Sequence, residues 1–207
     1  MSQYVTVKKE ASDEFAEKRS RFIGYIKPVT TEEEAVEFIN SIRSKHWDAR
    51  HNVYAYCLRQ NNQQRYSDDG EPSGTAGQPV LSVLTKSGTT DAVIVVTRYF
   101  GGILLGTGGL VRAYSHAAAL AIEAGVPVSM GECVRCRLTC AYDQYGRVSA
   151  LIPECGGFLD DSQFGAGVEI AFHMEESLLG GFEKKLADAT NGSVGFIREN
   201  TEFFEIT

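Results

Sequence analysis

Residues 91–124, DAVIVVTRYFGGILLGTGGLVRAYSHAAALAIEA, contain the elements that decide the fold of the first half of the chain. The apolar run from Ala92 to Val96 is typical of a strand that is covered on both faces. Five glycines follow between Gly101 and Gly109, and the apolar stretch after them predicts a helix. This succession of strand, glycine loop and helix indicates a domain built from both strands and helices.

Segments on the amino-terminal side complete this domain. Residues 31–45 have an apolar stripe at helical spacing and glutamates in the first turn, which predict a helix capped by Thr31. Residues 51–58 alternate between two faces and predict a strand. Residues 60–77 are polar and rich in turn residues, which predicts a loop, and residues 79–86 predict a short helix near a proline.

The rest of the chain predicts a second domain. The preceding helix is expected to break at Gly125, and we expect residues 126–133 to form a linker. Residues 133–207 predict the order strand, helix, strand, strand, helix, strand, which is that of a ferredoxin-like domain. The expected fold class is therefore α+β, of the sandwich type, with domains at 1–131 and 132–207.

The composition is that of a folded protein in a reducing compartment. Hydrophobic residues make up 43% and charged residues 23%, close to the averages for globular proteins. No run approaches the roughly 18 apolar residues that a membrane span needs, and the polar amino terminus does not resemble a secretion signal. Five cysteines at irregular spacing argue against a disulfide framework. We therefore expect a cytoplasmic protein without a membrane partner.

Charge is unevenly distributed along the chain. Residues 1–131 carry 14 Lys and Arg against 14 Asp and Glu, whereas residues 132–207 carry 6 against 13. Because nucleic-acid binding depends on neutralising phosphates, any contact with RNA is expected to use basic groups of the first domain. The acidic second domain repels polyanions and is a candidate surface for a protein partner.

The glycine loop is a candidate anion site. Backbone N–H groups and the positive end of a helix dipole meet where the following helix begins. The loop lacks the spacing of dinucleotide-binding and P-loop motifs, so the alternative remains that its glycines permit tight turns and close packing. The candidate binding residues here are Gly101, Gly102, Gly106, Thr107, Gly108 and Gly109, flanked by Arg98, Tyr99 and Arg112. The flanking basic groups favour an anionic partner, although Arg98 could equally pair with a nearby carboxylate.

A second cluster is acidic. Its carboxylates, Asp68, Asp69 and Glu71, are suited to binding a hard cation or to acid–base catalysis, and the hydroxyls of Ser73 and Thr75 are further candidate ligand groups. The alternative is a solvated turn in which a hydroxyl caps the next helix. No set of cysteines and histidines has the spacing of a zinc site, so no metal or cofactor is expected.

Basic groups from other segments are expected near the same surface. Arg19 and Arg21 lie in an early strand, and Arg50 and His51 open the strand over residues 51–58. A lone histidine is more often structural than catalytic, so His51 is included as a binding candidate and not as a base.

Two long stretches resemble the signature blocks of the YigZ/IMPACT family. They are SDDGEPSGTAGQP at residues 67–79 and RYFGGILLGTGGLVRAY at residues 98–114. Residues 18–22 and 48–51 are similar to that family's amino-terminal blocks, so the resemblance covers essentially the whole chain. It implies a ribosomal protein S5 domain 2-like fold for the first domain and a ferredoxin-like fold for the second, in an order similar to domains IV and V of elongation factor G.

Two functions stay open at this point. The first is a non-enzymatic factor that binds RNA or the ribosome through the first domain and regulates translation, which is what the resemblance implies. The second is a small enzyme, or a binder of a phosphate or nucleotide ligand, that uses the glycine loop with Asp68, Asp69 or Glu71.

Overall fold

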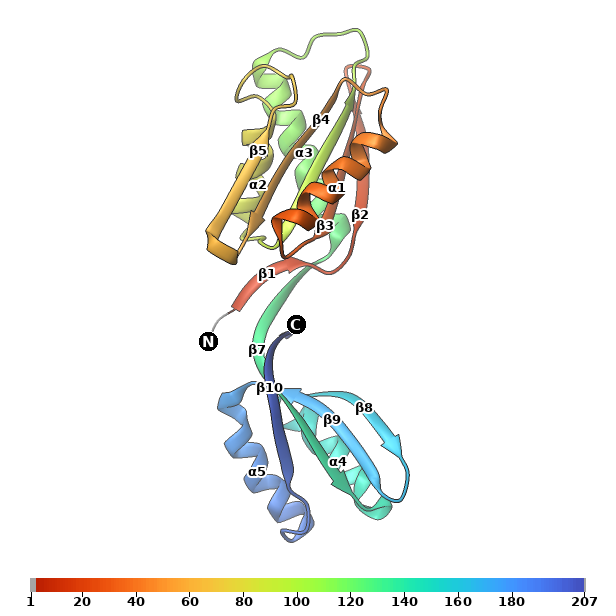
Figure 1. The fold of residues 1–207 in the computed structure, drawn as a ribbon, viewed down its shortest axis with the longest axis vertical. Helices are drawn as coiled ribbons and strands as arrows, with labels where there is room; N and C mark the ends of the chain where they lie inside the picture. The colour runs from red at the N-terminus through yellow and green to blue at the C-terminus, as the bar shows by residue number, and fades with distance from the viewer. Residues whose placement is uncertain (1–2, 207) are drawn as a thin grey trace. The chain divides into compact units, whose positions relative to one another are not determined.

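The computed structural model describes residues 3–206 of the 207-residue chain. Residues 4–129 form a first compact unit, and residue 3 together with residues 130–206 forms a second. The protein is thus an α+β protein of two units with two antiparallel sheets (Figure 1). None of the described helices is both long enough and apolar enough to cross a membrane.

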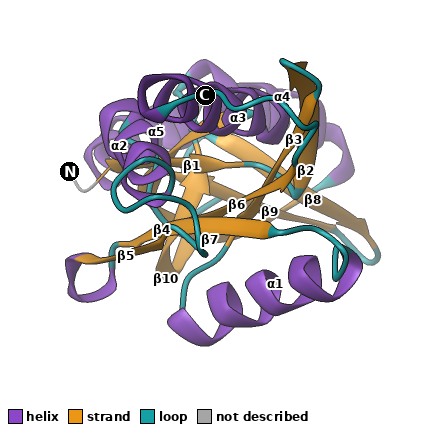
Figure 2. Cartoon of the chain, turned by 90° about the horizontal axis from the view of Figure 1, so that it is seen from above, coloured by secondary structure: helices purple, strands orange, loops and turns teal. Residues whose placement is uncertain are grey.

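The first unit is a sheet with helices on both faces. Its strands lie in the order β2 (Ala11–Glu17), β3 (Ser20–Pro28), β6 (Ala92–Tyr99), β4 (His51–Leu58) and β5 (Gln63–Ser67). Helix α1 (Glu32–Lys45) covers one face, and α2 (Gly77–Ser87) and α3 (Thr107–Gly125) cover the other (Figure 2). A short 3-10 turn, η1 (Gln60–Asn62), joins β4 to β5.

Strand β6 is central and buried on both sides. Val93 and Val95 face the cluster that contains α1, whereas Ile94 and Val96 face the cluster that contains α2 and α3. All four side chains are fully buried, which confirms the prediction from the apolar run.

Helix α1 begins where its sequence predicts. The hydroxyl of Thr31 accepts a hydrogen bond from the amide of Glu34, and the Glu34 carboxylate accepts one in return from the Thr31 amide. This reciprocal capping box satisfies amides that a helix start otherwise leaves unpaired. The buried stripe of the helix consists of Ala35, Phe38, Ile39 and Ile42.

Close packing of α3 on the sheet depends on one glycine. A Cβ atom built on Gly24 of β3 would lie 2.4 Å from the carbonyl oxygen of Ala117 in α3. Because only a residue without a side chain permits this approach, Gly24 determines how near the helix comes to the sheet.

The second unit has the element order that its sequence predicts. The elements are β7 (Pro127–Cys140), α4 (Tyr142–Glu154), β8 (Phe158–Phe164), β9 (Val168–Met174), α5 (Glu176–Thr190) and β10 (Phe196–Glu205). The second sheet has the order β1-β7-β9-β8, where β1 is Gln3–Val7, and β10 also pairs with β7. Cys136 and Cys140 point with Leu138 into the core of this unit, which is the packing role that strand alternation favours.

Two expectations about irregular segments were wrong. The stretch 60–77, predicted as a loop, contains strand β5, whose central side chains are exposed because it lies at the edge of the sheet. The stretch 126–133, predicted as a linker, is mostly the first part of β7. Pro127 is the first residue of that strand, where the missing N–H does not interrupt the hydrogen-bond ladder.

Candidate functional site

The strand register brings the sequence-predicted residues to one end of the first unit. Arg21 pairs with Tyr99 across β3 and β6, and His51 pairs with Arg98 across β4 and β6. The turn between β2 and β3, the start of β4 and the end of β6 therefore meet at the same edge, where α3 also begins (Figure 1). We call this region, formed by residues 17–21, 46–51, 68–76 and 98–112, the loop end.

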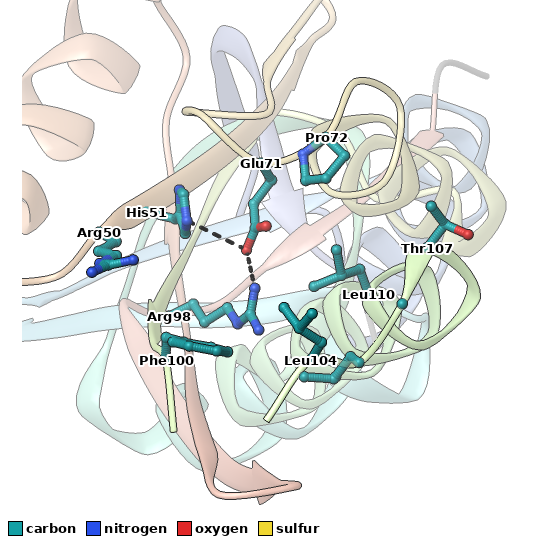
Figure 3. A pocket seen from close by; sticks show the side chains of 11 residues that line it. Arg50, His51, Glu71, Pro72, Arg98, Phe100, Leu104, Thr107 and Leu110 are labelled. Atoms are coloured by element: carbon teal, nitrogen blue, oxygen red, sulfur yellow. Dashed lines mark hydrogen bonds and ion pairs between the residues drawn. The ribbon is translucent and has the colours of Figure 1, made fainter. Parts of the chain in front are cut away.

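A cavity of about 330 Å³ opens at the loop end (Figure 3). Glu71, His51 and Arg98 supply its polar surface, and Arg50 and Thr107 are exposed residues of its lining. Its apolar walls are formed by Pro72, Phe100, Leu104, Leu105 and Leu110.

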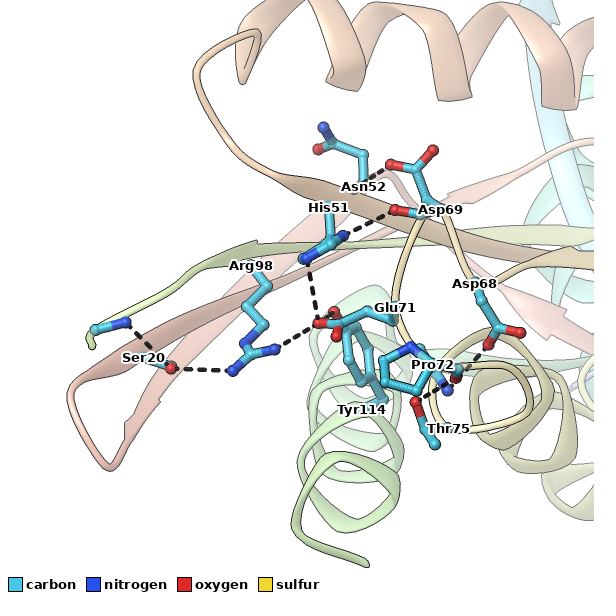
Figure 4. Close-up of polar contacts among 12 residues, drawn as sticks. Ser20, His51, Asn52, Asp68, Asp69, Glu71, Pro72, Thr75, Arg98 and Tyr114 are labelled. Atoms are coloured by element: carbon cyan, nitrogen blue, oxygen red, sulfur yellow. Dashed lines mark hydrogen bonds and ion pairs between the residues drawn. The ribbon is translucent and has the colours of Figure 1, made fainter. Parts of the chain in front are cut away.

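Glu71 is the centre of the polar surface (Figure 4). Its Oε1 accepts a hydrogen bond from Arg98 Nη1 at 2.6 Å and from the Tyr114 hydroxyl at 2.8 Å. The side chains of Glu71 and Arg98 are only 4% and 6% exposed. Burial, together with the nearby negative charge of Glu71, raises the pKa of Tyr114, so the hydroxyl stays a donor. Arg98 is therefore occupied by an internal carboxylate and is not available to an external phosphate.

Arg98 is also held on its other sides. Its guanidinium carbon lies over the rings of Phe22 and Phe100, at 5.5 and 5.4 Å from their centroids. Nη2 donates a long hydrogen bond of 3.4 Å to Ser20 Oγ, while Nε is buried and has no acceptor among the described residues. The side chain thus joins β3, β6 and residues 68–76, which we call the acidic loop.

The carboxylates of Asp68 and Asp69 are bound by internal donors. Asp68 accepts hydrogen bonds from the amides of Gly74, Ala76 and Gly77, and so caps the start of α2. Asp69 accepts from the Asn52 amide at 2.7 Å and from Arg43 at 2.9 Å.

The two hydroxyl candidates of this loop differ in exposure. The Thr75 hydroxyl donates to the Pro72 carbonyl at 2.6 Å, and only Ser73 is exposed. Together with the two aspartates, these bonds hold the acidic loop in one conformation beside the cavity.

The glycine loop is partly closed and partly open. The Gly101 amide donates to Ser20 Oγ at 3.3 Å, and a Cβ on Gly101 would lie 2.0 Å from the Arg19 carbonyl oxygen, so this glycine permits a close approach. Further on, Gly106 has a φ of +74° and precedes α3 without any side-chain cap. Thr107, Gly108 and Gly109 form the first turn of α3, where Thr107 lines the cavity. Gly102 is exposed.

Besides Arg21, four basic residues of the loop end are exposed: Lys18, Arg19, Arg50 and Arg112. None of these four makes an ion pair with any described residue. Arg112 and Lys18 line a second cavity of about 230 Å³ beside Glu17.

Two other candidates have internal partners. Arg21 forms an exposed ion pair with Glu14 at 2.5 Å. The Tyr99 hydroxyl donates to Asp48 at 2.9 Å and contacts His46 Nδ1 at 2.8 Å.

One prominent residue of the loop end was missed by the sequence reasoning. Trp47 follows α1 and is 83% exposed, and Leu104, also in the loop end, is 82% exposed. Trp47 is the only tryptophan of the chain and lies between polar residues. A large aromatic residue in a polar segment indicates an exposed interaction site and could have been identified from the sequence. The alternative that Arg98 pairs with a carboxylate is confirmed, but the sequence did not identify Glu71 as that carboxylate, because 27 residues separate the two.

Comparison with known proteins gives matches over nearly the whole chain. Residues 18–122 match the model of the Impact N-terminal domain, and residues 138–193 match a domain of unknown function, DUF1949. The "IMPACT family member YvyE" of Bacillus subtilis is 39% identical over 93% of this chain and 89% of its own length. The "IMPACT family member YigZ" of Escherichia coli is 38% identical over 86% of this chain and 88% of its own length.

A solved structure is also similar. A crystal structure described as that of a hypothetical protein matches with a TM-score of 0.61 and 34% identity, over 97% of this chain and 98% of that one. The chain therefore belongs to the IMPACT family, as a member of the YigZ and YvyE type in which an Impact N-terminal domain precedes a DUF1949 domain.

Proposed function

We propose that this protein binds RNA or the ribosome through the loop end of its first unit and regulates translation without catalysing a reaction. The observation that carries the proposal is the set of exposed basic side chains, Lys18, Arg19, Arg50 and Arg112, that have no ion pair among the described residues. Such groups are free to neutralise phosphates, which is the main source of affinity for nucleic acids.

The acidic groups of the loop end support the same proposal. The carboxylates of Asp68, Asp69 and Glu71 each accept hydrogen bonds from internal donors, which stabilise the negative charge that would otherwise oppose RNA. Exposed Trp47 adds an aromatic ring on which an unpaired base can stack. The alternative of acid–base catalysis by the acidic cluster has less support, because Asp68 and Asp69 hold backbone amides in place.

The finer fold assignment is part of the proposal. The sheet order β10-β7-β9-β8 favours a ferredoxin-like second domain at 132–207, and the sheet order β2-β3-β6-β4-β5 is consistent with a ribosomal protein S5 domain 2-like first domain at 1–131. We infer a cytoplasmic protein whose domains correspond to domains IV and V of elongation factor G. In this scheme the acidic second domain contacts a protein and not RNA.

The test is the salt dependence of RNA binding by the full chain. Binding of a fluorescein-labelled single-stranded RNA should weaken steeply as the salt concentration rises, because each phosphate contact releases counterions. Arg50→Gln should weaken binding and lower the slope of log K against log salt by about 1. Arg65→Gln is the matched control, since Arg65 is an exposed arginine in the edge strand β5.

Two results would contradict the proposal. One is the absence of salt-dependent RNA binding at low ionic strength. The other is an equal effect of both substitutions, which would mean that any surface arginine contributes and that the loop end is not the binding surface.

A further inference from the structure

We propose that the cavity at the loop end binds one unpaired guanine base, and that Glu71 and His51 accept hydrogen bonds from the edge of that base. The proposal deepens the RNA-binding function and rests on it where the guanine belongs to RNA. The same chemistry would bind a free guanine nucleotide, and the experiment below separates the two sources.

The first step is that the polar surface of the cavity presents an unused acceptor at Glu71. The contacts of the Glu71 carboxylate with Arg98, Tyr114 and His51 all fall on Oε1 (Figure 4). Among the described residues, the buried side-chain atoms that lack a partner are Arg98 Nε and His173 Nε2. Glu71 Oε2 is not among them although no described residue donates to it, so it retains accessible surface, and Glu71 is a lining residue of the cavity.

His51 adds a second acceptor. Its Nδ1 lies 2.8 Å from the Asp69 carbonyl oxygen, and since a carbonyl only accepts, Nδ1 must carry the hydrogen. In the neutral ring Nε2 is then an acceptor, and it lies 3.9 Å from Glu71 Oε1. Two acceptors therefore lie side by side on one wall of the cavity (Figure 3).

These acceptors are held in place before any ligand arrives. Arg98 and Tyr114 fix the orientation of the Glu71 carboxylate, and Asp69 fixes the His51 tautomer. A carboxylate that is oriented in advance loses little conformational freedom when a ligand binds. The Arg98 groups that could attract an anion, Nη1 and Nη2, already donate to Glu71 and Ser20. The interior of the cavity thus selects hydrogen-bond donors.

Guanine is the base that matches two adjacent acceptors. Its Watson–Crick edge presents the N1–H and N2–H donors next to each other, and unpaired bases in RNA are recognised on this edge. The amino groups of adenine and cytosine lie beside a ring acceptor, and the N3–H of uracil lies between two carbonyls. Each of these three bases would place an acceptor against the Glu71 carboxylate, which is unfavourable.

The rest of the cavity fits the remainder of a nucleotide. Phe100, Leu104 and Pro72 offer apolar contacts to the faces of a ring, and about 330 Å³ lies at the lower end of the volumes of small-molecule sites. Thr107 and the uncapped start of α3 border the same cavity as the exposed Arg50. The phosphate on the ribose of that nucleotide would meet backbone N–H groups and a guanidinium there.

The first experiment compares ligands on the full-length protein. Isothermal titration should show that GMP binds at least tenfold more tightly than IMP, which lacks the 2-amino group, and more tightly still than AMP, because each lost donor leaves an acceptor unpaired. In parallel, a ten-nucleotide oligouridine with one central guanosine should bind more tightly than the same RNA with central inosine or adenosine.

The second experiment changes the acceptor. In Glu71→Gln the amide oxygen should take the place of Oε1 under Arg98 and Tyr114, which leaves an NH2 donor towards the cavity. The advantage of GMP over AMP should then disappear, a change of preference that a loss of folding alone does not produce. Leu104→Ser, at a side chain that is 82% exposed, should weaken GMP and AMP equally, and Ile197→Ser in the second unit is its control.

The outcomes separate this inference from the proposed function. Equal affinities for GMP, IMP and AMP, or an unchanged GMP preference in Glu71→Gln, would overturn the guanine site. A preference for GMP combined with RNA binding that does not depend on the central base would refute RNA as the source of the guanine and assign the site to a free guanine nucleotide, while leaving RNA binding by the arginines intact. A preference for GMP without RNA binding would support the site and refute the RNA function.

Discussion

At the scale of single residues, Glu71 and Arg98 connect the loop end to the core. Their ion pair is almost fully buried, and the Tyr114 hydroxyl donates to the same carboxylate oxygen as Arg98. Removing two charges from water costs more than most ion pairs return, so such a pair is weak evidence for stability by itself. Removing Arg98 alone is destabilising, because the Glu71 carboxylate would then be buried without a positively charged partner.

Arg98→Met should therefore destabilise the protein strongly. It leaves the Glu71 carboxylate buried, and we expect a loss of about 3–5 kcal/mol in the free energy of unfolding, measured by urea denaturation. Arg65→Met, at an exposed position, should change it by less than about 0.5 kcal/mol. Similar effects for both variants would mean that the pair is not buried in solution.

His46 should make stability depend on pH. It lies between the hydroxyls of Tyr25 and Tyr99, at 2.7 and 2.8 Å, and burial lowers its pKa below the ordinary value of 6.5. The unfolded chain then binds a proton at a higher pH than the folded chain does. The contribution of neutral His46 to the free energy of unfolding is therefore complete above pH 6.5. It declines as the pH falls from 6.5 towards the lower pKa of His46 in the folded protein.

The variant His46→Gln should remove this decline. Unfolding by urea at pH 7.5 and pH 5.5 should show a smaller difference in the variant than in the unchanged protein. His116→Gln, at an exposed histidine, is the control. If it reduced the difference in stability between pH 7.5 and pH 5.5 as much as His46→Gln does, the pH dependence could not be assigned to His46.

At the scale of elements, helix starts and helix contacts depend on a few positions. The capping box at Thr31 satisfies amides of α1, and the Asp68 carboxylate does the same for α2 from eight residues before Ala76. The first is local and follows from a known spacing. The cap of α2 forms only when the acidic loop brings Asp68 back to the amides of Ala76 and Gly77, and no known spacing of residues predicts this.

Thr31→Ala should destabilise the first unit by about 1 kcal/mol, the usual cost of losing a cap. Ser44→Ala, at an exposed position within the same helix, should be neutral or slightly stabilising, since alanine is the better helix former. Circular dichroism during thermal unfolding is the measurement. An unchanged melting temperature in Thr31→Ala would show that the cap contributes nothing to the fold.

Two glycine substitutions should have opposite effects. Gly24→Ala places a Cβ 2.4 Å from the Ala117 carbonyl oxygen and should cost roughly 1–3 kcal/mol or more, because α3 would have to move off the sheet. Gly180→Ala, inside α5 with open space around it, should stabilise by about 0.5–1 kcal/mol. If both variants behaved alike in urea, the close approach of α3 to β3 would be refuted.

At the scale of the whole molecule, the chain has separate cores in its two units. The first unit has buried clusters on both faces of its sheet, and the second has its own cluster around Phe172 and Phe182. All five cysteines are free, and Cys57 lies in the first unit while the other four lie in the second. Thiol reactivity can therefore follow each unit by itself.

The native protein should expose one reactive thiol to an aromatic disulfide reagent at pH 8. Cys155 is partly exposed, whereas burial raises the pKa of Cys57 and of Cys136 to about 11 and keeps them as thiols. Cys155→Ser should abolish the fast phase. Cys136 should react slowly, at the rate at which the second unit unfolds, and Cys57 at the rate at which the first unit unfolds. Fast reaction of more than one thiol would show that the other cysteines are not buried.

Much of this architecture was predictable from periodicity. The helix over residues 31–45, the buried strand β6 and the order of elements in the second unit all follow from patterns that repeat within one turn or two residues. Strand β5 was missed because an exposed edge strand has no apolar alternation. The first part of β7 was missed because a helix break and a proline are also the signs of a linker.

The sequence by itself determined the class of the fold, most of its elements, the uneven charge of its two halves and the family. Only the tertiary structure decided which charges remain available. Arg98 and Arg112 are both arginines beside the same glycine loop, yet one is buried against Glu71 and the other is exposed. The physical reason is that hydrophobic periodicity acts over a few residues, whereas the pairing of a buried charge depends on which distant segments the packed sheet brings within about 3 Å of it.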